Sequence, residues 1–360
     1  MKRFTSGTMR SAMDGARLSA AHDLVRRTLA RHGLGPHSAS TAAEEGRAMP
    51  SLDRMTARFA GPKGIVPTPG QTSPKGAEFR DDTFTCHAGS RTYRTYVPAS
   101  AAEGVTGVIM MLHGCTQTPE DFAAGTDMNA LAERHRFVVV YPAQSRGDNA
   151  QSCWNWFSRG DQQRGRGEPA ILAGIATKVC AERGVGRDRT FVAGLSAGAA
   201  MAVILGETYG DVFSAIGAHS GLPAGAANDV PSAFAAMGGN ALDPASPLRS
   251  AHPTRTIIFH GTSDATVHAS NSEAIARRAL AAGWPQSVET TTQGQATGRR
   301  YTRITSRDHE GRSVVEHWSI HGQGHAWSGG HRAGSYTDPE GPDASAEMIR
   351  FFNDTADGEL

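Results

Sequence analysis

The sequence lacks several features that would place the protein in a special class. No apolar run reaches the roughly 20 residues that a helix needs to cross a bilayer, so we expect no membrane-spanning helix. An excess of charge of one sign is also missing, because 36 Lys and Arg against 35 Asp and Glu give a formal net charge of +1. Proteins that bind nucleic acids or other polyanions carry a basic excess, so the composition favours a neutral substrate.

Cysteine is scarce: the chain has Cys86, Cys115, Cys153 and Cys180. No two of them have the spacing of a C-x-x-C motif, which excludes a zinc ribbon and a thioredoxin-like redox site. Four cysteines allow three full pairings, and the spacing does not choose among them. We interpret Cys86 and Cys180 as small, buried apolar residues.

A typical secretory signal is also absent from the first residues. Lys2 and Arg3 are basic, but Arg10, Asp14 and Arg17 interrupt the apolar stretch that should follow them. On this ground we expect a cytoplasmic protein.

Two N-terminal segments precede the main domain. Apolar residues recur at helical spacing between 9 and 32, with arginines between them, so residues 1–34 are predicted to form an amphipathic helix. This helix either docks on the main domain or a partner subunit, or lies on a membrane or a lipid-coated surface such as a polymer granule. Residues 35–80 are rich in proline and glycine and are interpreted as a linker.

From residue 81 to residue 354, apolar runs alternate with stretches of helical character. Continuous apolar strands separated by helices are typical of a parallel sheet that is buried on both faces. We therefore predict an α/β domain with a mostly parallel central sheet and helices on both faces. The expected strands are 91–97, 107–112, 137–141, 190–193, 215–218, 255–259 and 313–318, and the expected helices are 126–135, 169–183, 197–209 and 271–282.

The strongest local motif is Gly194-Leu-Ser196-Ala-Gly198, which follows the strand 190–193 and precedes a good helix former. A G-x-S-x-G motif between a strand and a helix is typical of α/β-hydrolases, in which the turn exposes the serine hydroxyl at a helix N-terminus. We predict that Ser196 is the nucleophile of this fold.

A serine needs a base to accept its proton and a carboxylate to orient that base. In this fold the acid and then the histidine follow the serine along the chain. Asp264 comes directly after the strand 255–259, whereas its rivals Asp243 and Asp308 follow no apolar strand. For the base we choose His325, which lies in a glycine-rich loop. His321 is interpreted as a strand-end residue and His331 as a surface residue.

The oxyanion of the reaction needs backbone N–H donors. One is expected from Ala197, the residue after the nucleophile, and the second from the loop that follows an early strand. The segment His113-Gly-Cys115 fits that loop, so the N–H of Cys115 is the second predicted donor. The ring of His113 is interpreted as a packed, hydrogen-bonded strand-end residue.

Beyond these motifs, residues 83 to 352 resemble the polyhydroxybutyrate depolymerase family of esterases. The resemblance rests on the segments LHGCTQTPEDFAAGTDMNALAE, CWNWF, GEPAILAGI, GLSAGAAMAVIL, AHSGLPAGAA, FHGTSDATV, GQGHAWSGG and GSYTDPEGPDASAEMIRFF. It implies hydrolysis of poly(3-hydroxyalkanoate) or its short oligomers, an extracellular or granule-directed location, and the same triad and oxyanion residues. It further implies a disulfide between Cys115 and Cys153.

The aromatic residues Trp154, Trp156 and Phe157 of the CWNWF segment, together with Trp327, are candidates for an apolar substrate groove. Tryptophan is equally common as core or rim packing, so the sequence leaves both roles open.

The resulting hypothesis is a serine carboxylic-ester hydrolase that needs no metal and no organic cofactor. Feruloyl or acetylxylan esterase activity on plant polysaccharide is the alternative within the same class. A protein that coats a polyester granule without catalysis is the alternative from another class, and transfer of the acyl group to an acceptor alcohol is a third.

Overall fold

The computed structural model describes residues 74–241, 251–284 and 287–354. The predicted N-terminal helix and the predicted linker up to residue 73 lie outside these residues, as does Asp243. The first strand begins at Glu78, a little before the expected domain start at residue 81.

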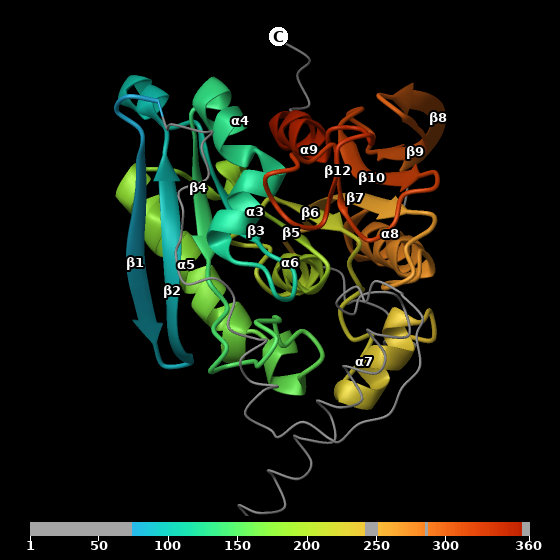
Figure 1. The fold of residues 1–360 in the computed structure, drawn as a ribbon, viewed down its shortest axis with the longest axis horizontal. Helices are drawn as coiled ribbons and strands as arrows, with labels where there is room; N and C mark the ends of the chain where they lie inside the picture. Colours follow the sequence, from blue (N-terminus) through green and yellow to red (C-terminus); the bar gives the residue numbers. More distant parts are fainter. Residues whose placement is uncertain (1–73, 242–250, 285–286, 355–360) are drawn as a thin grey trace, which may run out of the picture. The chain divides into compact units, whose positions relative to one another are not determined.

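The described chain is built on a sheet of ten strands in the order β1-β2-β4-β3-β5-β6-β7-β10-β9-β8 (Figure 1). The strands β4, β3, β5, β6, β7 and β10 run parallel to their neighbours in this series, and antiparallel strands extend both edges. The strands are β1 (Glu78–Cys86), β2 (Gly89–Val97), β3 (Gly107–Leu112), β4 (Phe137–Pro142), β5 (Thr190–Leu195), β6 (Ala215–His219), β7 (Arg255–Gly261), β8 (Val288–Ala296), β9 (Arg299–Arg307) and β10 (Ser313–Ile320), with β11 (Trp327–Ser328) and β12 (Thr337–Asp338) forming a separate pair.

Helices cover both faces of the sheet, as predicted. Successive residues of a strand point to opposite faces, so each central strand supplies two apolar layers. In β3, for example, Val108 and Met110 pack in one layer, and Ile109 and Met111 pack in the other. The first layer contains α5 (Gly167–Arg183), α6 (Ala197–Thr208), α7 (Val230–Met237) and α8 (Ser270–Gly283), and the second contains α3 (Pro119–Thr126), α4 (Met128–His135) and α9 (Ala344–Asn353).

The sequence-based elements of the central sheet are largely confirmed, but several elements differ. The helix expected over 126–135 corresponds to α4, and α3 before it was not predicted; Asp127, in a left-handed backbone conformation (φ 52°), separates the two helices. The hairpin of β8 and β9 was not predicted, because β8 is polar and almost fully exposed and owes its place to pairing with β9. Strand β1, the short pair of β11 and β12, and the helices α7 and α9 were also missed.

The topology brings the predicted functional segments to one edge of the sheet. The carboxyl ends of parallel strands meet at the same edge, where open α/β sheets place their ligands. The segments after β3, β5, β7 and β10 carry Cys115, Ser196, Asp264 and His325. Within the described residues, no helix is both long enough and apolar enough to cross a membrane.

Candidate active site

Ser196 occupies the sharp turn between β5 and α6. Its backbone is strained (φ 58°, ψ −118°), a conformation that L-residues rarely adopt. The flanking glycines explain how this turn fits: a Cβ at Gly198 would lie 2.1 Å from the carbonyl oxygen of Leu112, and one at Gly194 would lie 2.4 Å from the carbonyl carbon of Gly198. The predicted strand–turn–helix context of the motif is therefore present, with Ser196 partly exposed.

Asp264 and His325 are brought together across 61 positions of the chain. The Nδ1 of His325 lies 2.7 Å from Oδ2 of Asp264, and Oδ1 of the same carboxylate accepts the N–H groups of Thr266 and Val267, both at 2.9 Å. The two backbone donors fix the carboxylate, and the carboxylate in turn orients the imidazole. This arrangement has the geometry of the acid and base in a serine hydrolase triad.

The hydroxyl of Ser196 makes no hydrogen bond with the described residues, so the hydrogen bond between Ser196 Oγ and His325 is absent from this structure. In enzymes without substrate this bond is often long and tightens only when the substrate is bound. His219 links the segments that carry Ser196 and His325. The carbonyl oxygen of His219 accepts the Ser196 N–H at 2.9 Å, and the ring of His219 stacks on Trp327, two residues after His325.

The charge of Asp264 is strongly favoured. Burial on its own would raise the pKa of this carboxyl, but hydrogen bonds from His260 and His325, and the positive charge of His325, outweigh burial and hold its pKa well below the usual range. The side chain of His260 is almost fully buried, with Nε2 lying 2.8 Å from the carbonyl oxygen of Val267 and 3.4 Å from Oδ2 of Asp264. An ionised Asp264 can stabilise an imidazolium on His325.

His219 remains neutral beneath the site. Burial lowers its pKa well below the ordinary value, and the nearby His260 and His325 lower it further. Its Nε2 accepts the N–H of Ser328 at 3.0 Å, which fastens the loop that follows His325. His325 is partly exposed at the carboxyl end of the sheet, whereas His219, His260 and His317 are buried.

The two predicted oxyanion donors are available. Ala197 is the first residue of α6, and the first N–H groups of a helix have no partner inside it. Within the described part of the chain, neither the Ala197 N–H nor the Cys115 N–H donates a hydrogen bond. A Cβ at Gly114 would lie 3.5 Å from the carbonyl oxygen of Leu195, so the Cys115 loop passes directly beside the Ser196 turn.

The predicted disulfide between Cys115 and Cys153 is confirmed. It ties the loop after β3 to the CWNWF segment. Cys180 is buried as expected, whereas Cys86 is only half-buried. His113 is confirmed as a packed strand-end residue, because it is buried and its Nε2 accepts the N–H of Gln144 at 3.1 Å.

The structure corrects the substrate-groove prediction for Trp154 and Trp327. Trp154 is fully buried and donates its indole N–H to the carbonyl oxygen of His113 at 2.9 Å. Trp327 is also buried and donates to Ser345 Oγ at 3.0 Å. Rings that have no free face hold loops in place and cannot receive a substrate. Trp156 is also buried, with 6% of its surface exposed. Of the four predicted groove residues, Phe157 is the one that is half-buried.

Two residues near the site were not found from the sequence. Tyr336, 38% exposed, has a left-handed backbone (φ 52°), and its hydroxyl lies 3.3 Å from Oγ1 of Thr116, next to Cys115. Glu168 is a buried carboxylate beside the CWNWF segment. The sequence does contain a weak signal for each, because both lie in segments that carry the family resemblance.

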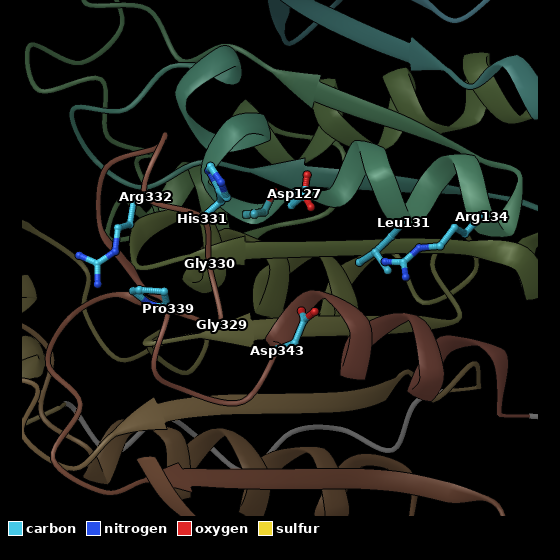
Figure 2. A pocket seen from close by; sticks show the side chains of 10 residues that line it. Asp127, Leu131, Arg134, Gly329, Gly330, His331, Arg332, Pro339 and Asp343 are labelled. Carbon is cyan, nitrogen blue, oxygen red and sulfur yellow. The ribbon is translucent and has the colours of Figure 1, made fainter. Parts of the chain in front are cut away.

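A cavity of about 380 Å³ is lined by residues of α3, α4 and the segment from Gly329 to Asp343 (Figure 2). None of Ser196, Asp264 and His325 lines it, and its charged lining comes from Asp127, Arg134, His331, Arg332 and Asp343. His331 is exposed, as predicted. Within the described residues, no group of three or more His, Cys, Asp or Glu side chains could hold a metal ion.

The predicted rivals have other positions. Asp308 accepts the N–H groups of Glu310 and Arg312 and shapes the turn between β9 and β10. His321 follows β10, with Nε2 lying 3.1 Å from Oγ1 of Thr302. Neither contacts Asp264 or His325.

Comparisons with known proteins find similar esterases. The chain is 33% identical over 230 residues to poly(3-hydroxyalkanoate) depolymerase C of Paucimonas lemoignei, which covers 61% of this chain and 54% of the relative. It is 28% identical over 227 residues to acetylxylan esterase A of Aspergillus oryzae, covering 58% of this chain and 73% of the relative. The chain thus spans about half the length of the depolymerase that it matches.

Solved structures confirm the α/β-hydrolase fold. An acetyl xylan esterase from Aspergillus awamori has a TM-score of 0.58 at 19% identity, covering 73% of this chain and 93% of that one. An S-formylglutathione hydrolase from Agrobacterium tumefaciens has a TM-score of 0.52 at 13% identity, covering 79% and 98%. Residues 91–299, more than half of the chain, match the family described as esterase PHB depolymerase, and this protein therefore belongs to that family.

Proposed function

We propose that this protein is a serine esterase that cleaves its substrate through an acyl-enzyme on Ser196. Ser196 Oγ attacks the ester carbonyl while His325 Nε2 accepts its proton, and Asp264 holds the imidazole in the tautomer that leaves Nε2 free. The protonated His325 then gives the proton to the leaving alcohol. Water then attacks the acyl carbonyl by the same route, which breaks the bond to Ser196 Oγ, releases the carboxylic acid and regenerates the hydroxyl.

The tetrahedral oxyanion of both steps is stabilised by the N–H groups of Ala197 and Cys115. Removing one such donor typically slows an enzyme by about a hundredfold or more. The single observation that carries the proposal is the Asp264–His325 pair, formed at the same sheet edge as a serine in a strained, glycine-flanked turn. No structural role of an ordinary loop requires this combination.

For the substrate we propose esters of poly(3-hydroxyalkanoate) or its short oligomers. The near-zero net charge suits a neutral polymer, and the name of the 33% identical relative gives the substrate class. Since Trp154 and Trp327 are buried, we assign the apolar contact beside the oxyanion loop to Tyr336, whose ring is exposed next to Thr116.

A carbohydrate esterase is the second candidate, because the chain is also similar to acetylxylan esterase A over 73% of that enzyme's length. Both candidates use the same acyl-enzyme chemistry and differ only in the alcohol and acyl groups that the cleft admits. The catalytic residues therefore do not distinguish the two candidate functions, and measured substrate specificity must distinguish them.

The test is hydrolysis of defined 3-hydroxybutyrate oligomers, feruloyl esters and acetylated xylan by the wild type and by Ser196→Ala. We expect the oligomers to be preferred and Ser196→Ala to be inactive on all three. Preference for acetylated xylan would select the second candidate. An inactive wild type that a fluorophosphonate fails to label at Ser196 would favour a granule-binding protein without catalysis.

We further propose that the protein works in an oxidising compartment. The Cys115–Cys153 disulfide supports this, since cytosolic thiols are normally kept reduced. This proposal replaces the sequence-based expectation of a cytoplasmic protein. Contact of the N-terminal segment with a polymer granule stays a prediction, because that segment lies outside the described residues.

A further inference from the structure

Glu168 is a buried carboxylate to which the proposed reaction gives no role. It is the second residue of α5 and is 4% exposed. Its Oε2 accepts the Asn155 N–H at 2.7 Å, and its Oε1 accepts the side-chain amides of Asn155, at 2.9 Å, and of Gln144. The guanidinium of Arg91 lies 3.6 Å away. Burying a carboxyl group is costly unless its oxygens are hydrogen-bonded, so this arrangement calls for a function.

The groups bound to Glu168 belong to the segment that supports the oxyanion loop. Gln144 donates its backbone N–H to the ring of His113 at 3.1 Å and its side-chain amide to the carbonyl oxygen of Cys153 at 2.9 Å. Trp154, next to Asn155, donates to the carbonyl oxygen of His113 at 2.9 Å. His113 lies two residues before Cys115 in the chain.

A second connection runs through covalent and backbone bonds. Cys153 is joined to Cys115 by the disulfide, and the N–H of Thr116 donates to the carbonyl oxygen of Gln151 at 2.8 Å. Thr116 itself has a left-handed backbone (φ 68°). A strained loop keeps such a conformation only where its surroundings determine it, and residues 144–155 are part of those surroundings, together with Tyr336.

We infer that Glu168 is a positioning residue for the oxyanion hole, which fixes the Cys115 N–H by holding residues 144–155 against the loop after β3. This inference rests on the proposed function. Glu168 contacts neither the substrate nor the reacting atoms and acts through Asn155 and Gln144. Misplacing a catalytic group by about 1 Å can cost up to a hundredfold in rate, so the loss of this anchor is expected to reduce kcat.

The test is the variant Glu168→Gln, which keeps the shape of the side chain but cannot ionise and replaces one acceptor oxygen with a donor. Glu182→Gln is the matched control, because Glu182 is an exposed residue of the same helix. Both are assayed on p-nitrophenyl butyrate after active-site titration, which corrects for any inactive fraction. We expect a 10- to 100-fold lower kcat for Glu168→Gln with KM within threefold, and wild-type values for Glu182→Gln.

The second measurement is inhibition by an alkylboronic acid, which forms a tetrahedral adduct with the serine and places an oxygen in the oxyanion hole. If Glu168 positions the donor, the inhibition constant rises by about the same factor as kcat falls. A side chain that only stabilises the fold would lower the thermal midpoint but leave this constant unchanged in the folded fraction.

Gln144→Ala removes the hydrogen bond between Gln144 and Glu168 from the Gln144 side. This variant tests the positioning role if Glu168→Gln does not fold. Wild-type kcat and an unchanged boronate constant in the folded variants would overturn the inference. A wild type without esterase activity would instead refute the proposed function itself, so the two failures are distinguishable.

Discussion

Breaking the disulfide is expected to reduce both the stability and the rate. The cysteines are 38 positions apart, and a cross-link that closes a loop of this length lowers the entropy of the unfolded chain by an amount worth about 4 kcal/mol at 25 °C. Domains are typically stable by about 5–15 kcal/mol, so the loss is a large share of the total. Cys153→Ser removes the bond but leaves the backbone N–H of Cys115 in place.

The assay is urea unfolding followed by tryptophan fluorescence, with and without a phosphine reductant. We expect Cys153→Ser to unfold at a clearly lower urea concentration, the reductant to shift the wild type by a similar amount, and the variant to be insensitive to it. Cys86→Ser is the matched control, since Cys86 is a free, half-buried cysteine.

The rate should change as well, because the disulfide is one of the links that hold the Cys115 loop. We expect kcat of Cys153→Ser to fall at least tenfold, under conditions in which the variant is still folded. The reasoning is refuted if the native protein has alkylatable thiols at both positions, or if wild type and Cys153→Ser unfold together in the absence of reductant.

Four further changes test other parts of the site. Asp264→Asn should lower kcat by about 10⁴ with little change in KM, because the amide stabilises the wrong imidazole tautomer; an unchanged rate on p-nitrophenyl butyrate would remove Asp264 from the triad. Gly198→Ala should destabilise the fold by about 1–3 kcal/mol in urea unfolding and slow the reaction, because its Cβ would meet the backbone of β3. Tyr336→Ala should impair polymer hydrolysis more than hydrolysis of a small ester, and equal losses would exclude a groove role. Burial raises the pKa of Glu168 to about 7, so its contribution to the free energy of unfolding is present below about pH 4.5 and is lost as the pH rises through 7. Urea unfolding should therefore show the wild type losing about 3 kcal/mol over that range relative to Glu168→Gln. Parallel pH profiles of the two proteins would contradict this.

The central fold and the Asp264–His325 pair beside the Ser196 turn could be predicted because their signals are local. Strands such as Phe137–Pro142 are buried on both faces and therefore read as continuous apolar runs. Ser196 is marked by its glycines, which the close approach of Leu112 requires. Asp264 and His325 could be placed because each follows a recognisable strand end.

The roles of the aromatic residues could not be predicted in the same way. Trp154 and Tyr336 are both large aromatic residues in segments that carry the resemblance, yet one is fully buried and the other is 38% exposed. The difference depends on the loop after β3, which covers Trp154 and binds its indole N–H through the carbonyl of His113. Contacts between segments that are distant in the chain decide whether each aromatic side chain is buried, and the composition of the sequence does not reveal these contacts.

Glu168 illustrates the same limit for charge. A glutamate in the first turn of a helix is ordinarily exposed, where it favours the helix dipole, and the sequence gives no reason to expect otherwise. It is buried because residues 144–155 fold over the start of α5 and offer it three N–H donors. The chemical groups of the site follow strand ends and can be read from the chain. The groups that position these catalytic groups come from loops packed on one another. Because the rate depends on the catalytic groups and on the groups that position them, Glu168→Gln and Ser196→Ala should each lower kcat, although only Ser196 carries a sequence motif.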